Sequence, residues 1–144
     1  MKYIVYVSQA IKPFDNDELA QLLEHSRENN VKDGITGLLI YRFNSDFNRG
    51  NFVQVLEGSE QAIDDVWRRI SNDDRHHTIV VIDEQSIETR MFEQWSMGFR
   101  NVQSAELKNI EGFSDLGSDE FWARTTAGDV PDALDLLKSF YDGG

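Results

Sequence analysis

The sequence lacks cysteine altogether, which excludes disulfide bonds, thiolate metal sites and cysteine nucleophiles from its 144 residues. It also lacks a signal-peptide pattern and any apolar run of membrane-spanning length, so we expect a cytoplasmic protein. Basic residues are scarce, with 14 Lys and Arg against 26 Asp and Glu, for a net charge of −12. Because such a surface repels nucleic acid and anionic lipid, neither is expected as a partner. The pair His76-His77 has no third ligand nearby and is interpreted as turn residues, so no metal site is predicted.

A glutamine lies in the middle of an otherwise apolar segment at residues 52–58, which is typical of a buried strand. Strand geometry places Phe52, Gln54 and Leu56 on one face. An amide without a partner in that interior costs roughly 1–3 kcal/mol, so we expect both of its ends to be paired. Two kinds of partner stay open. One is a nearby backbone N–H or carbonyl group. The other is a side chain from another apolar strand, where Tyr6 and Met97 are the candidates.

The order of the apolar patterns predicts the architecture. Strands are expected at residues 3–8, 35–41, 52–58, 78–83 and about 94–100, with helices from Asp15 or Asn16 and over about 60–72. This βαββαββ order indicates an α+β, ferredoxin-like sheet with two helices on one face. The polar stretch from Arg42 to Asn51 is expected to form a loop that is long for a hairpin.

The other face of this sheet needs a cover, because it presents only branched apolar side chains to solvent. These are Val5, Val7, Leu38, Ile40, Val53 and Val55. An amphipathic helix that starts at Pro131 is the expected cover, and at most a short helix near 120–124 precedes it. We therefore expect a main domain at residues 1–102 and a linker with capping helices at 103–144, both in one structural unit.

The first helix carries an apolar stripe that turns polar near its end. Leu19, Leu22 and Leu23 are followed on the same face by Ser26, and then by Asn29 and Asn30. Such a change predicts hydrogen bonding to something beside the helix end. The alternative is that Asn29 and Asn30 form a helix C-cap.

Several segments together, in this order, resemble the BLUF family, the blue-light sensors that use FAD. The resemblance covers residues 3 to about 100. The matching segments are Tyr6 with Ser8, residues 26–30, residues 34–37, residues 52–58, residues 73–76 and residues 95–97.

The resemblance implies a flavin held between the two helices with its ring edge against the sheet. Asn30 and, secondarily, Asn29 would then hydrogen-bond the polar edge of the ring, and Gln54 would lie between the flavin and Tyr6. Ser26, Met97 and Trp95 would surround the ring, and Leu22 and Ile70 would pack against its faces. Arg69 and Asp73 would bind the ribityl and phosphate tail, and Arg75 and Lys32 would add positive charge there. FAD is the implied cofactor, and FMN or riboflavin carries the same ring. The absence of cysteine excludes a covalent cysteinyl–flavin adduct.

The implied function is a blue-light photoreceptor rather than an enzyme. Excited flavin would take an electron and a proton from Tyr6, and Gln54 would flip or tautomerise to give a red-shifted state. Because the chain ends soon after the covering helix, the output would pass to a separate signalling protein or through rearrangement of a homo-oligomer. Two alternatives stay open: a light-independent flavin oxidoreductase, and a small regulatory ligand-binding module. We expect no general acid or base on the cleft face beyond Tyr6, which argues against the oxidoreductase.

Overall fold

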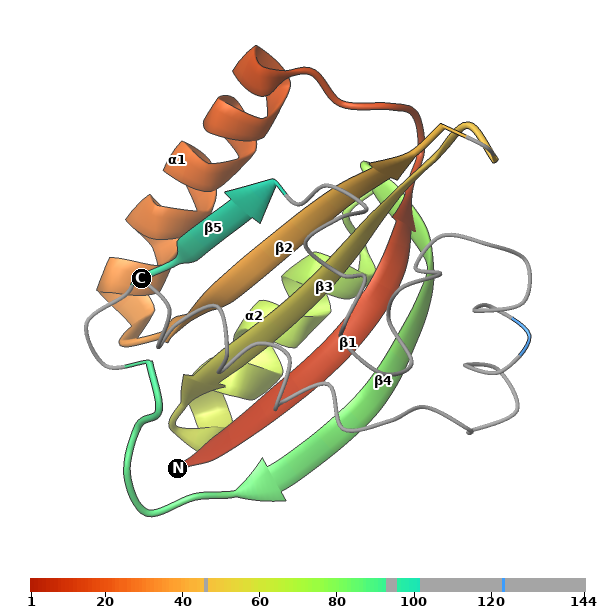
Figure 1. Cartoon of the computed structure of the whole chain (residues 1–144). Helices are drawn as coiled ribbons and strands as arrows, with labels where there is room; N and C mark the ends of the chain where they lie inside the picture. Colours follow the sequence, from red (N-terminus) through yellow and green to blue (C-terminus); the bar gives the residue numbers. More distant parts are fainter. Residues whose placement is uncertain (46, 93–95, 102–122, 124–144) are drawn as a thin grey trace.

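A computed structural model describes residues 1–45, 47–92, 96–101 and 123 (Figure 1). Its elements follow the predicted βαββαββ order, so the expected α+β fold is confirmed. They are β1 (Lys2–Ala10), α1 (Asn16–Asp33), β2 (Thr36–Asn44), β3 (Arg49–Gly58), α2 (Glu60–Ser71), β4 (His76–Ser86) and β5 (Gly98–Asn101). Of the helices within the described residues, neither is long and apolar enough to cross a bilayer.

The strands form one twisted sheet in the order β4-β1-β3-β2-β5, and both helices lie against the same face of it (Figure 1). Neighbouring strands are antiparallel except β2 and β5, which are parallel. Since β1 and β3 are central neighbours, Tyr6 and Gln54 lie directly opposite each other in register. Leu19 and Leu23 of α1 and Ile63 of α2 are buried in the core between the helices and this face. The sheet therefore presents Tyr6 and Gln54 to the space between the helices.

Helix α1 begins and ends with the caps that its sequence encodes. Asp15 and Glu18 form the predicted reciprocal capping box at its N-terminus. At the other end Gly34 adopts a left-handed conformation with φ of 69°, and its backbone N–H donates to the carbonyl of Asn30. The helix thus continues through Asn29 and Asn30, and the alternative that these residues are the C-cap is wrong. Their side chains therefore project from the body of the helix rather than capping its end.

The predicted long loop at residues 42–51 is wrong. Strand β2 runs to Asn44 and β3 starts at Arg49, with Arg42 opposite Asn51 and Asn44 opposite Arg49. Only residues 45–48 connect them. Arg42, Asn44 and Asn51 are buried although they are polar, and their polarity gave the misleading loop signal. Strands β2 and β3 therefore pair as a β-hairpin out to Asn44 and Arg49.

The second face of the sheet is as deeply buried as predicted. Each of its six branched side chains has an exposed fraction of 0%, namely Val5, Val7, Leu38, Ile40, Val53 and Val55. The expected helices near 120–124 and from Pro131, and the partition at 103–144, lie outside the described residues. Strand β5 starts at Gly98, so Met97 lies just before the strand and not within it as predicted.

Candidate functional site

A cleft opens between α1 and α2 above the centre of the sheet. About 730 Å³ of space lies between its walls, part of it open solvent. All the residues predicted to bind a cofactor line it: Tyr6, Leu22, Ser26, Asn29, Asn30, Gln54, Arg69, Ile70 and Asp73. Arg75 lines the cleft as well, whereas Lys32 is exposed and does not. The fold thus gathers four separate segments of the chain at one site.

A chain of hydrogen bonds runs from the floor of the cleft into the core. The Tyr6 hydroxyl donates to Gln54 Oε1, and Gln54 Nε2 donates to Met97 Sδ at 3.3 Å. The three side chains are 4%, 5% and 2% exposed, so water does not compete for these bonds. Both ends of the Gln54 amide are therefore paired with side chains from other segments. The alternative, a backbone group as the partner of the amide, is wrong.

Burial keeps the Tyr6 phenol protonated. It raises the pKa of Tyr6 far above its ordinary value, and the nearby Asp73 carboxylate adds to this while Arg75 opposes it. The Trp67 ring packs edge-on against the Tyr6 ring, with centroids 5.3 Å apart. Tyr6 is consequently a neutral hydrogen-bond donor in a fixed orientation, aimed at Gln54.

The side chains of α1 hold the segment that precedes β5. Asn30 Nδ2 donates to the carbonyl of Ser96 at 2.8 Å, and Arg27 Nε donates to the carbonyl of Met97 at 2.9 Å. An amide has a second N–H and a carbonyl, so Asn30 retains groups for a ligand in the cleft. Asn29 instead contacts His25 one turn earlier, at 3.3 Å between Nδ2 and Nε2. Asn30 thus connects the cleft to the residues beside Met97.

Two arginines at the mouth of the cleft are each paired with a carboxylate. Arg69 of α2 reaches Asp33 at the end of α1, with 2.6 Å between Nη2 and Oδ2. Arg75 binds Asp73 through both Nε and Nη2. Burial alone would raise the pKa of Asp73, but its bonds with Arg75 outweigh this and hold that pKa below its ordinary value. The positive charge at the mouth is therefore partly neutralised.

Sequence reasoning missed the histidines of the cleft. His76, interpreted as a turn residue, starts β4 and bridges Ser8 Oγ and the Ile70 carbonyl at 2.7 Å each. With His25 and Asp73 it lines the cleft, so the expectation of no acid or base beyond Tyr6 is wrong. However, His76 and Asp73 are both engaged in bonds that hold the fold. His76 lies at the start of β4, which pairs with β1, the strand that carries Tyr6. This position was the feature of the sequence that could have indicated that His76 lies at the cleft.

The residues fit a flavin. Leu22 and Ile70 lie on different helices and supply apolar contact for a flat ring, while Gln54 and Asn30 supply amide groups for its polar edge. Within the described residues, no group of three or more potential ligands is placed to hold a metal ion. Trp95 lies outside the described residues.

Comparison with known proteins assigns the family. Residues 1–98 match the family model for BLUF, sensors of blue-light using FAD. The chain is similar to a bacterial light-regulated adenylyl cyclase structure, with 28% identity and a TM-score of 0.69 over 96% of this chain and 39% of that one. It is also similar to the BLUF protein BlrB in its dark state, with 32% identity and a TM-score of 0.65 over 90% of this chain and 96% of that one.

Curated relatives are longer proteins. The beta subunit of the photoactivated adenylate cyclase of Euglena gracilis is 27% identical over 95 residues, which are 65% of this chain and 10% of that protein. The blue light- and temperature-regulated antirepressor BluF of Escherichia coli is 25% identical over 105 residues, which are 72% and 25% of the two chains. The present chain spans about a tenth of the length of the cyclase subunits. It belongs to the BLUF family of flavin-binding blue-light sensors, whose cofactor is FAD.

Proposed function

We propose that the protein is a blue-light photoreceptor in which Tyr6 is the electron and proton donor and Gln54 is the hydrogen-bond switch. The observation that carries this proposal is the chain from Tyr6 through Gln54 to Met97 at the floor of the cleft. When bound, the flavin supplies the light absorption and the excited-state oxidising power. Tyr6 gives up an electron and its phenolic proton and later recovers both.

Gln54 suits the switch because its two ends are nearly isosteric but opposite in hydrogen-bonding character. In the structure its carbonyl accepts from Tyr6 and its NH2 faces Met97, and we assign this arrangement to the dark state. Once the phenolic proton has left, the bond that fixes this orientation is lost. Rotation or tautomerisation of the amide then re-pairs the bonds with little movement of heavy atoms. A new donor toward a flavin carbonyl lowers the excitation energy and shifts absorption to the red.

The residues around Gln54 have supporting roles in this proposal. Asn30, with Asn29 in second place, binds the polar edge of the ring, and Ser26, Met97 and Trp95 complete its surroundings. Leu22 and Ile70 sandwich the ring. Arg69 and Asp73 bind the ribityl and phosphate tail, and FMN or riboflavin can replace FAD because most contacts are made to the ring.

We further propose that the chain is a sensor without its own catalytic output. Residues 1–102 form the photosensor and 103–144 complete the same structural unit. Its output passes to a separate signalling protein or through a homo-oligomer. Support comes from BlrB, a BLUF protein that aligns over 96% of its own chain. Relatives named as adenylate cyclases join a similar domain to an enzyme in one chain.

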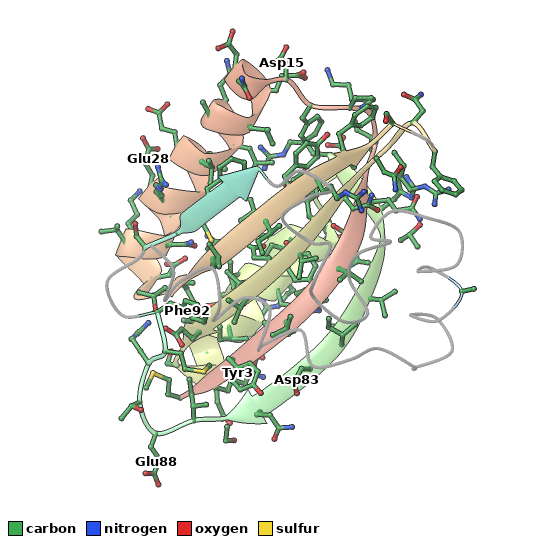
Figure 2. All side chains as sticks on the ribbon, viewed as in Figure 1. Tyr3, Asp15, Glu28, Asp83, Glu88 and Phe92 are labelled. Carbon is green, nitrogen blue, oxygen red and sulfur yellow. The ribbon has the colours of Figure 1, made fainter. Side chains whose placement is uncertain are left out.

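Two tyrosines on β1 give a matched test. Tyr6 and Tyr3 are 4% and 5% exposed, but Tyr3 faces the second side of the sheet and donates to Asp83 at 2.6 Å (Figure 2). Each variant, Tyr6→Phe or Tyr3→Phe, removes one buried hydroxyl. Absorption spectra before and after blue illumination should show a reversible red shift in wild type and Tyr3→Phe, and none in Tyr6→Phe. A wild-type shift and dark recovery in Tyr6→Phe would overturn the proposal.

The alternative of a dark oxidoreductase has its own test. The acids and bases in the cleft are His25, Asp73 and His76. Asp73 is bonded to Arg75, and His76 is bonded to Ser8 and to the Ile70 carbonyl. Bound flavin should therefore not be reduced in the dark by added metabolites with a nicotinamide or alcohol group. Substrate-dependent bleaching of the flavin in the dark would favour the enzyme instead.

A further inference from the structure

The imidazole of His76 joins two elements that border the cleft. His76 lines the cleft together with Tyr6 of β1 and Ile70, which lies near the C-terminal end of α2. Its Nδ1 atom lies 2.7 Å from Ser8 Oγ on β1. Its Nε2 atom lies 2.7 Å from the backbone carbonyl oxygen of Ile70. One ring therefore spans from the strand that carries Tyr6 to the end of the helix.

The chemistry of the two partners fixes how this bridge is bonded. A carbonyl oxygen only accepts, so Nε2 carries a hydrogen and donates it to Ile70. In a neutral imidazole Nδ1 is then an acceptor, and the Ser8 hydroxyl donates to it. Ser8 has an exposed fraction of 0%, so water does not compete for this bond. A protonated ring would donate through both nitrogens, and the hydroxyl would accept, so the bridge holds in either charge state.

The same ring contacts the Tyr6 side chain. The His76 ring packs edge-on against the Tyr6 ring, with centroids 6.1 Å apart, and edge-on against the Phe52 ring at 6.3 Å. Ser8 follows Tyr6 by two positions in β1, so both side chains lie on the same face of the strand. The bond from Ser8 therefore holds the imidazole beside the Tyr6 phenol.

The bond to His76 differs in kind from other bonds of α2. The Ile70 carbonyl also accepts the backbone N–H of Asp73 at 3.1 Å, but this bond ties Ile70 only to its own turn. Near the start of α2, Asp64 pairs with Lys2 of β1 at 3.1 Å, and the Asp64 side chain is 58% exposed. Because exposed ion pairs contribute little, the bridge through His76 is the firmer link between α2 and β1.

We propose that His76 is a positioning residue that fixes the gap between Ile70 and Tyr6, and with it the distance from the flavin ring to the Tyr6 phenol. The inference rests on the proposed function, in which Ile70 packs against the ring and Tyr6 gives the electron. Without the bridge the end of α2 can move away from β1, and the gap takes a range of widths. A misplacement of about 1 Å can change the rate of a positioned reaction by about 100-fold, so a small opening is measurable.

The fluorescence decay of the flavin bound to the full chain measures this gap, because electron transfer from Tyr6 competes with emission. His76→Leu keeps approximate volume and removes both ring nitrogens, so the decay should become severalfold slower and spread over several components. His76→Gln keeps an NH2 group for Ile70 and a carbonyl for Ser8, so it should restore most of the wild-type decay. His77→Leu is the matched control, since His77 is exposed and bonds its neighbour Thr78. Its decay should equal that of wild type.

Ser8→Ala separates the bridge from a direct contact between His76 and the flavin. Ser8 is not among the described residues that line the cleft, so this variant removes the strand end of the bridge and leaves the lining intact. Its decay should slow in the same direction as that of His76→Leu. A wild-type decay in Ser8→Ala would overturn the proposal, also in the case that His76→Leu does not fold.

Tyr6→Phe distinguishes a failure of this inference from a failure of the proposed function. If Tyr6 is the donor, Tyr6→Phe slows the decay by itself, and adding Ser8→Ala to it should change the decay little. If Tyr6→Phe decays like wild type, the donor role of Tyr6 is wrong, and riboflavin affinity then decides the role of His76. A severalfold loss of affinity in Ser8→Ala, with none in His77→Leu, supports the bridge. Wild-type affinity in Ser8→Ala would contradict it.

Discussion

Strand β3 carries buried polar side chains on both faces, and the partners of Gln54 and Glu57 differ in kind. Gln54 faces the cleft and bonds the side chains of Tyr6 and Met97, which have rotatable bonds of their own. Glu57 faces away and bonds two backbone N–H groups and a hydroxyl. Side-chain partners can exchange without refolding the chain, whereas backbone partners move only with their segment. The difference teaches that one strand can present an amide whose partners can exchange, as the proposed switch at Gln54 requires, and a carboxylate whose partners cannot.

The chemical types match these roles. A neutral amide has a donor end and an acceptor end that exchange on rotation, and its burial costs little once both ends are paired. A buried carboxylate is acceptor-only and very costly to leave without donors. The amide of Gln54 can therefore re-pair, as the proposed switch requires, whereas the carboxylate of Glu57 cannot lose its donors without a large cost.

The largest expected effect is a difference in the free energy of unfolding between a variant at Glu57 and a variant at Gln54. Glu57→Ala leaves two backbone N–H groups without their acceptor, so it should lower the free energy of unfolding by about 3 kcal/mol or more. Gln54→Leu keeps approximate volume and should cost about 1 kcal/mol, with flavin retained and the light-induced red shift lost. Urea unfolding of both flavin-loaded variants in the dark measures this. Equal losses of stability in the two variants would break the comparison.

The next effect concerns Asn30, which joins the cleft to the residues beside Met97. Asn30→Ala removes a bond to the Ser96 carbonyl and the proposed bonds to the ring edge. Flavin affinity should fall by about 1–3 kcal/mol, roughly 5- to 150-fold, and the dark spectrum should shift. Titration of the apoprotein with riboflavin measures the loss without any contribution from phosphate. Unchanged affinity together with an unchanged spectrum would show that Asn30 serves the fold alone.

The smallest effect lies at the rim, where groups are exposed and bonds are weak. Asp33 holds Arg69 in an ion pair whose side chains are 33% and 47% exposed. Asp33→Asn should free Arg69 for a phosphate and raise FAD affinity relative to riboflavin by about 0.2–1 kcal/mol, roughly up to fivefold. Asp65→Asn is the control, since Asp65 pairs with Arg68, which is 71% exposed. An equal change for FAD and riboflavin would remove any role of Arg69 at the phosphate.

The fold could be predicted from local patterns, whereas the cleft and its residues were implied by the resemblance to the BLUF family. Apolar periodicity gave the order of the strands and helices, and the Asp15–Glu18 spacing gave the start of α1. The stripe from Leu19 to Asn30 placed the polar helix face at the cleft. In these cases local preference and tertiary packing favour the same structure.

Features that depend on pairing between distant segments were not predictable in this way. Arg42 and Asn51 are polar, yet their cross-strand pairing extends the hairpin and removes the expected loop. His76 looked like a turn residue because its partners, Ser8 and Ile70, are contributed by other elements. Glu57 gave no signal, since a carboxylate at the end of a strand is usually solvated, and the backbone N–H groups that bury it come from a remote segment.

The side-chain amide signals of Gln54 test the central claim most directly. They can be assigned in a nitrogen-labelled sample as the pair that disappears in Gln54→Leu. In the dark, the account predicts an NH2 group turned toward Met97, with both signals shifting when Met97 is replaced by leucine. Under blue light, these signals should move to new positions and return at the same rate as the absorption spectrum recovers. Gln54 amide signals that stay unchanged while the absorption shifts to the red would contradict the account.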